Sequence, residues 1–142
     1  MFRFRLDRVL GWEQSKCNLE EFKTGQVSAC LHQANSALAR LRADYISGEH
    51  EAMAASAIGG QELHVLAMWR NVFRRKQDEL EFACREWERK LFEQRARWVE
   101  ARRRCRLLEN LRSRRQGEYE YEASRANEAA AGEAFLIRWS RR

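Results

Sequence analysis

Residues 73–108 read FRRKQDELEFACREWERKLFEQRARWVEARRRCRLL, and the placement of charge in this stretch decides the fold. Counting alternately four and three residues from Phe73 gives eleven positions without charge, although 19 of the 36 residues are charged and random placement would put about six charges there. A charge-free stripe that repeats every 3.5 residues is typical of a helix wound against another helix in a left-handed coiled coil. The eleven positions are Phe73, Gln77, Leu80, Cys84, Trp87, Leu91, Gln94, Trp98, Ala101, Cys105 and Leu108.

The first half of the chain carries the same repeat. The count from Leu6 continues through Leu10, Glu13, Cys17, Glu20, Thr24, Val27, Leu31, Ala34, Leu38, Leu41 and Tyr45. These two sets of positions are called the seam. Polar residues weaken the part between residues 13 and 25, where we expect the helix to be bent or loosely packed, and Gly25 lowers helix stability there by about 1 kcal/mol relative to alanine.

Ile58-Gly59-Gly60 separates the two repeats, and paired glycines supply positive φ angles that redirect a chain. We therefore predict an all-α fold in which two long helices form an antiparallel coiled-coil hairpin. The expected single domain comprises a helix over 6–57, a turn over 58–61, a helix over 62–115 and an overhanging helix over 116–139. Facing residues should have numbers that sum to about 119. A parallel dimer of one continuous helix is the competing arrangement.

Composition and charge point to the kinds of partner that the protein binds. The chain has no proline, 34% charged residues and a net charge of +6, and nine arginines fall within residues 95–115 against Glu100 and Glu109. We call these nine arginines the arginine band, and we interpret it as a docking surface for nucleic acid, an acidic membrane or an acidic protein. The apolar residues near the end of the sequence, Phe135, Leu136, Ile137 and Trp139, indicate a surface that a partner covers.

Catalytic and metal chemistry is not expected. His32, His50 and His64 have no convergent acid or nucleophile, and the four cysteines lack the spacing of a metal site. No phosphate-binding glycine loop, signal peptide or membrane-spanning stretch is visible. We predict a non-enzymatic, cofactor-free, soluble protein of the reducing cytosol.

Both ends of the sequence resemble one family. The opening Phe2-Arg3-Phe4-Arg5-Leu6-Asp7-Arg8-Val9-Leu10 is similar to the F-x-F-x-L-x-x-V-L start of the flagellar export protein FliJ family. The family's EAR…LEKLRERR segment is similar to Glu100-Ala101-Arg102 with Leu108-Glu109-Asn110-Leu111-Arg112. The motif near the C-terminal end of the family is similar to the stretch from Glu118-Tyr119 through Glu133.

The resemblance implies a soluble, peripheral component of the flagellar type III protein export apparatus at the inner membrane. Family members form a stalk-like hairpin in the hexameric export ATPase and contact the membrane export gate protein and export chaperones. Carried over to this sequence, the export-gate contacts are Leu38, Leu41, Tyr45, Trp69, Val72, Phe73 and Lys76. The ATPase contacts, at the end with the termini, are Phe4, Arg102, Arg103, Arg104, Arg112 and Arg115. Lys76 and Glu79 depart from the mostly apolar family pattern.

Three alternatives stay open at this point. One is a stalk protein of a virulence type III secretion system, which the sequence separates from a flagellar one only through the end motifs. Another is a generic scaffold coiled coil. The third is a nucleic-acid-binding coiled coil that uses the arginine band on phosphates, although few aromatic residues interleave the band.

Overall fold

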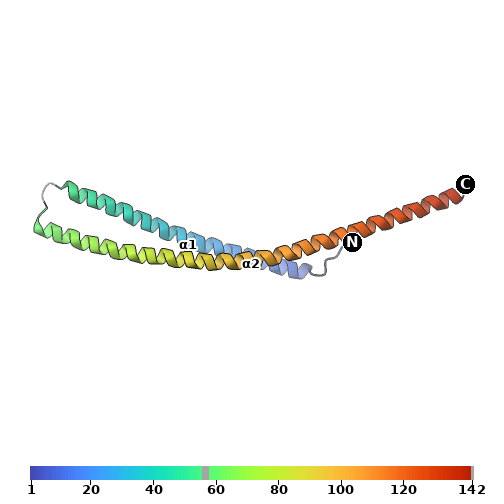
Figure 1. The fold of residues 1–142 in the computed structure, drawn as a ribbon, viewed down its shortest axis with the longest axis horizontal. Helices are drawn as coiled ribbons and strands as arrows, with labels where there is room; N and C mark the ends of the chain where they lie inside the picture. The colour runs from blue at the N-terminus through green and yellow to red at the C-terminus, as the bar shows by residue number, and fades with distance from the viewer. Residues whose placement is uncertain (56–57, 142) are drawn as a thin grey trace. The chain divides into compact units, whose positions relative to one another are not determined.

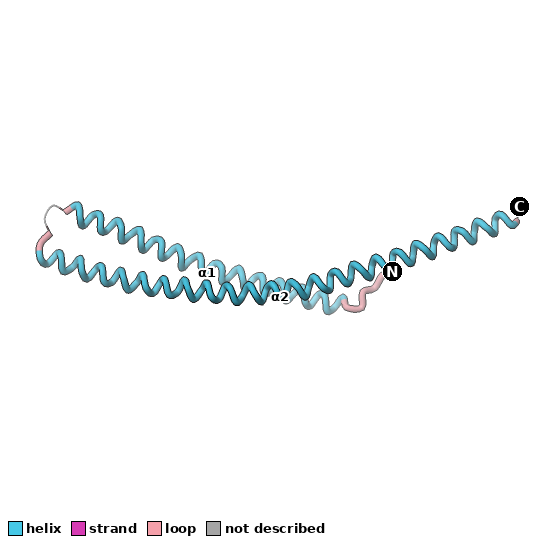
Figure 2. Tube along the Cα trace, viewed as in Figure 1, coloured by secondary structure: helices cyan, strands magenta, loops and turns pink. Residues whose placement is uncertain are grey.

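The computed structural model describes residues 1–55 and 58–141. Two helices make up nearly all of this part of the chain, α1 (Asp7–Ala54) and α2 (Gly60–Ser140), and no strand is present in the described residues (Figures 1 and 2). The two helices pack against each other in antiparallel directions, which confirms the predicted all-α hairpin.

Contacts divide the chain into two compact units, each formed by both helices. The turn unit comprises Glu20–Trp98, and the termini unit comprises Met1–Leu19 with Val99–Arg142. Within the termini unit, α2 continues to Ser140, so the predicted overhanging helix over 116–139 is helical throughout.

Burial follows the predicted seam. All seven buried residues of the described chain are seam positions: Leu10, Glu13, Leu38, Cys84, Leu91, Gln94 and Cys105. The other seam positions from Leu10 to Tyr45 and from Phe73 to Leu108 are half-buried. A two-helix hairpin has only one shared face, so each helix buries a narrow stripe and leaves the rest in water.

The register also agrees with the prediction. In the turn unit, Glu49 pairs with Arg70, and in the termini unit Asp7 pairs with Arg112; each pair of numbers sums to 119. The predicted level of Tyr45, near residue 74, is occupied by Phe73, with the ring centroids 3.9 Å apart.

The start of α2 corrects the predicted turn. We expected a turn over 58–61 with positive φ at the paired glycines, but α2 begins at Gly60 and no glycine of the described chain has a positive φ. Gly59 instead caps the helix: its N–H donates to Glu62 Oε2 (2.9 Å) and its carbonyl accepts from Leu63 N (3.0 Å). Glutamate three residues after the cap is the capping-box arrangement. The predicted end of the first helix, at residue 57, lies outside the described residues, and α1 ends at Ala54.

Polar seam residues do not interrupt α1, although we expected a weak segment near residues 13–25. In the turn unit, Gln94 donates from Nε2 to the Glu20 carboxylate and to the Glu20 carbonyl (3.3 Å), while Thr24 donates to the same carbonyl (2.8 Å). The hydrogen bond from Gln94 holds the pKa of Glu20 below its ordinary value of 4.5. These bonds satisfy polar groups that the seam removes from water.

Candidate interaction surfaces

An aromatic cluster occupies the turn unit between the two helices. Tyr45 of α1 stacks on Trp69 and Phe73 of α2, with ring centroids 5.1 and 3.9 Å apart. Offset stacking of this kind adds about 0.5–1.5 kcal/mol per pair beyond the burial of apolar area. All three were predicted gate contacts, and the structure gives each of them a role in holding the hairpin together.

Gly48 makes room for this cluster. A Cβ at Gly48 would lie 2.7 Å from Cζ2 and 2.8 Å from Cη2 of Trp69, closer than such atoms approach in proteins. The indole therefore rests directly against the backbone of α1. The seam repeat ends at Tyr45 and does not predict this contact, although glycine three residues after a seam tyrosine is a usable signal of close helix approach.

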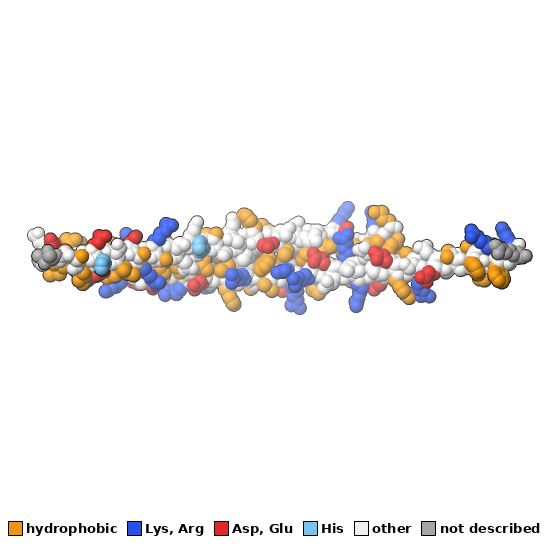
Figure 3. All heavy atoms as spheres, turned by 90° about the horizontal axis from the view of Figure 1, so that it is seen from above, with side chains coloured by type: hydrophobic (Ala, Val, Ile, Leu, Met, Phe, Trp, Pro, Cys, Tyr) orange, Lys and Arg blue, Asp and Glu red, His pale blue; other side chains and the backbone are white. Residues whose placement is uncertain are grey.

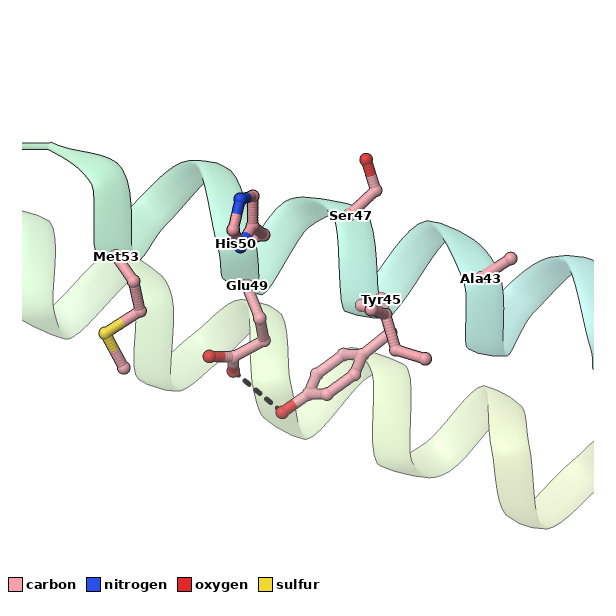
Figure 4. Close-up of a pocket in the computed structure, with 7 residues that line it drawn as sticks. Ala43, Tyr45, Ser47, Glu49, His50 and Met53 are labelled. Carbon is pink, nitrogen blue, oxygen red and sulfur yellow. Dashed lines mark hydrogen bonds between the residues drawn. The ribbon is translucent and has the colours of Figure 1, made fainter.

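A polar network flanks the cluster. Arg70 donates to both carboxylate oxygens of Glu49, with Nη2 2.9 Å from Oε2, and the Tyr45 hydroxyl donates to Oε1 (2.7 Å; Figure 4). The bidentate guanidinium, followed by the tyrosine hydrogen bond, holds the pKa of Glu49 below 4.5. The same carboxylate raises the pKa of Tyr45 above its ordinary 10.0. The network fixes the rotation of α1 against α2 at this level.

The remaining predicted gate contacts divide by exposure. Leu38 is buried and Leu41 half-buried, so both lie in the seam. Val72 and Lys76 are exposed, four residues apart and therefore on the same side of α2. Of the predicted set, these two are the exposed residues.

A groove of about 840 Å³ in the turn unit was not predicted from the sequence. Its apolar lining includes Ala52, Ile58, Val65, Leu66 and Trp69, and Asp44, Glu51 and Glu62 contribute carboxylates. The exposed Met68 and Val72 follow Val65 at a spacing of three and four residues on α2. Apolar side chains and carboxylates therefore line this groove together.

The motif residues of the sequence come together in the termini unit. The ring of Phe2 lies 5.8 Å from the ring of Tyr119, and the amino group of Met1 donates to the Tyr119 hydroxyl (3.0 Å). Asp7 forms an ion pair with Arg112 (3.7 Å). The predicted contact Phe4 is half-buried and lines a groove with Leu111 and Arg115.

The arginine band is exposed, and it is accompanied by carboxylates. Arg104 pairs with Glu100 (3.3 Å) and Arg115 with Glu118 (3.0 Å), both on the surface of α2. Arg102 lines a polar groove together with Cys105 and Glu109. At 100° per residue, the predicted contacts Arg102, Arg103 and Arg104 point in three different directions around the helix. The band therefore encircles α2, and Figure 3 shows basic and acidic side chains interspersed along the visible face.

Several aromatic side chains lie outside the seam and are exposed. Phe22, Phe82 and Phe92 in the turn unit are 65%, 61% and 77% exposed, and Trp12 in the termini unit is 61% exposed with Lys16 Nζ 3.6 Å above its ring.

The described residues contain no group of three or more metal-ligating side chains. Within the same described ranges, no helix is long and apolar enough to cross a membrane. No protein-family model, curated protein or solved structure matches the chain.

Proposed function

We propose that this protein is a non-enzymatic stalk component of a bacterial flagellar type III export apparatus. In this role, the termini unit contacts the hexameric export ATPase, and the turn unit contacts the membrane export gate protein. Export chaperones are further partners. The proposal starts from the resemblance of both sequence ends to the FliJ family and draws support from the antiparallel hairpin.

One observation carries the proposal furthest. The opening motif and the two motifs of the second helix are about 100 residues apart in sequence, yet Phe2 contacts Tyr119 and Asp7 contacts Arg112. Motif residues that pack on one another give a physical reason for both motifs to occur in one chain. A virulence-type stalk with the same hairpin would make the same contacts, so they support the link between the two end motifs without separating the two secretion systems.

The ATPase contact is tested by charge reversal in the arginine band. The variant Arg102→Glu, Arg103→Glu, Arg104→Glu should abolish stimulation of the export ATPase of the same bacterium and stop swimming motility. All three side chains are exposed, so circular dichroism should report unchanged helicity. The matched control reverses three exposed charges in the turn unit, Arg85→Glu, Arg89→Glu and Lys90→Glu, and should leave ATPase stimulation within about twofold of the parent.

The gate contact needs variants that leave the hairpin stable. Val72→Ser with Lys76→Glu changes two exposed residues and should weaken binding to the gate protein without reducing ATPase stimulation. Substituting Tyr45, Trp69 or Phe73 would remove the stack between the helices, and a loss of gate binding would then report unfolding. If both sets of variants reduce both activities equally, the assignment of separate contact surfaces is wrong.

A second candidate function rests on the exposure of the arginine band. A coiled coil that binds nucleic acid would place these arginines on phosphates and bind more weakly as salt rises. Fluorescence anisotropy with single-stranded RNA and duplex DNA at two salt concentrations separates the two functions. The stalk proposal would be overturned by two results together. The parent would bind nucleic acid tightly and in a salt-sensitive way, and the charge-reversed band variant would lose this binding while it still stimulates the ATPase fully.

A further inference from the structure

Residues 134–141, at the C-terminal end of α2 in the termini unit, carry a dense set of exposed apolar side chains. Phe135, Leu136, Ile137 and Trp139 are 64%, 65%, 54% and 71% exposed, and the rings of Phe135 and Trp139 lie 6.3 Å apart along one side of the helix. Figure 3 shows hydrophobic side chains along one edge of this end and basic side chains along the other. Such a concentration of apolar surface indicates a non-aqueous neighbour.

The width of the apolar surface helps to identify that neighbour. At 100° per residue, Phe135, Trp139, Leu136 and Ile137 span an arc of about 200° around the helix. A helix that packs on a protein surface typically presents an apolar stripe of about 100° or somewhat more, and a seam of alternating four- and three-residue steps is narrower still. An arc wider than half the circumference suits a helix that sinks partway into the boundary between lipid headgroups and acyl chains.

The polar group within that arc is already satisfied. Ser140 lies between Leu136 and Ile137 on the helical wheel, and its hydroxyl donates to the Ile137 carbonyl (3.0 Å). A hydroxyl that bonds to its own helix enters an apolar medium at lower cost than one that must leave water unpaired.

Charge identifies the lipid class. Residues 134–142 contain three arginines and no acidic residue, and Arg138 and Arg141 lie opposite the apolar arc. Arginine extends its aliphatic stem along apolar surface while its guanidinium binds phosphate, and tryptophan concentrates at membrane interfaces. We propose that residues 134–141 bind the surface of an anionic lipid bilayer, with the helix axis in the plane of the membrane.

Flotation of the full chain with vesicles tests this binding. Wild-type protein should float with vesicles of phosphatidylcholine containing about 30% phosphatidylglycerol and stay behind with phosphatidylcholine alone. Each arginine near an anionic surface contributes about fivefold to partitioning, so Arg138→Gln with Arg141→Gln should lower binding roughly 25-fold. Leu136→Ser with Trp139→Ser should reduce binding to a similar extent by removing apolar area.

The arginine band supplies the matched control. Arg106→Gln with Arg114→Gln removes the same charge from exposed positions of the same helix and should lower binding less than about threefold. A loss equal to that of the Arg138/Arg141 variant would mean that net charge alone drives binding, and the proposal would be wrong. Failure of the wild-type protein to bind anionic vesicles would also overturn it, in favour of a protein that covers the segment.

Insertion of the segment has its own readout. Brominated phosphatidylcholine quenches tryptophans that reach the acyl chains, so it should quench the wild-type protein more than the Trp139→Phe variant, which keeps an aromatic ring at that position. Equal quenching of the two proteins would contradict insertion. ATPase stimulation measured without lipid is independent of this result, so the stalk proposal and the lipid proposal can fail separately.

Discussion

At the scale of single residues, Gly48 and Trp69 show how one side chain sets the distance between two helices. Glycine inside a helix ordinarily lowers stability, so replacing it with alanine usually helps. At Gly48 the added methyl group would meet the Trp69 ring at 2.7 Å, and the ring is held in place by its stack on Tyr45. Replacing Gly48 with alanine should therefore lower the stability of the hairpin instead of raising it.

Gly48→Ala should lower the free energy of unfolding by about 1–3 kcal/mol, the usual cost of overpacking. Gly25→Ala is the matched control in the same helix and unit, because an added Cβ there meets nothing within 4 Å. It should raise the free energy of unfolding by about 0.5–1 kcal/mol. Urea denaturation followed by circular dichroism compares the two, and stabilisation by both substitutions would show that Trp69 moves aside at no cost.

Glu13 is a second residue whose substitution should stabilise or destabilise the fold contrary to the usual expectation, because its carboxylate occupies a buried seam position. Its side chain is buried in the seam of the termini unit; Oε1 pairs with Lys16 (3.3 Å), while Oε2 is buried without a hydrogen-bond partner. An unsatisfied buried polar atom costs about 1–3 kcal/mol. Glu13→Leu should raise the melting temperature, whereas Glu13→Ala should not, because it leaves a void. If Glu13→Leu lowers the melting temperature, an interaction of the carboxylate outweighs its desolvation.

At the scale of the helices, the seam repeat predicted which residues of α1 and α2 are buried, and the charge-free positions from Phe73 to Leu108 all proved buried or half-buried. The repeat could not predict the exact helix start, because Gly59 and Gly60 favour a turn and a helix cap equally well. Only the carboxylate of Glu62, three residues after Gly59, distinguishes the cap from the turn. The repeat also could not reveal the groove beside Trp69, since grooves depend on side-chain shape and not on polarity alone.

A pair of adjacent residues in α2 tests whether the seam holds the turn unit together. Leu91 is 7% exposed and its neighbour Phe92 is 77% exposed. Leu91→Ala should lower the free energy of unfolding by about 2–4 kcal/mol, and Phe92→Ala should change it by less than about 0.5 kcal/mol. A larger loss from Phe92→Ala would show that this exposed ring has an apolar neighbour in solution, and sedimentation velocity would then reveal self-association.

At the scale of the whole molecule, the candidate contacts were predicted less well than the fold. The family resemblance assigned Tyr45, Trp69 and Phe73 to partner binding, and the structure shows them packed between α1 and α2. A heptad pattern locates a residue on a helix face, but it cannot tell an aromatic ring that stabilises the hairpin from one that binds a partner. Exposure separates them, and it leaves Val72 and Lys76 as the testable members of that set.

Hydrogen-bonded carboxylates, a hydrogen-bonded tyrosine and a buried cysteine make stability depend on pH. Glu20, Glu49 and Glu81 have pKa values held below 4.5 by their hydrogen-bond partners, so their contributions are present above pH 4.5 and are lost as the pH falls through the folded pKa values. Burial raises the pKa of Cys105 above 9.0, and Glu49 raises that of Tyr45 above 10.0. These two groups keep their protons longer when folded, so stability also falls as the pH rises past these values.

Thermal melts near pH 3, 7 and 10.5 should therefore give the highest melting temperature at the middle value. Tyr45→Phe with Cys105→Ala should flatten the alkaline side. On the acidic side it should weaken only the part of the Glu49 contribution that depends on the tyrosine hydrogen bond, because Arg70 still binds that carboxylate. An alkaline decrease that persists in the double variant would assign the effect to other groups.

Both halves of the seam belong to one chain, so the stability of the hairpin does not depend on protein concentration as that of a coiled-coil dimer does. Forming the hairpin is a unimolecular reaction, so mass action does not oppose it on dilution. The melting temperature should stay constant over a hundredfold range of protein concentration, whereas a dimer of continuous helices would melt at a lower temperature when dilute. A protein built this way keeps its fold when only a few copies are present in a cell, and it can leave one assembly and enter another without unfolding between them.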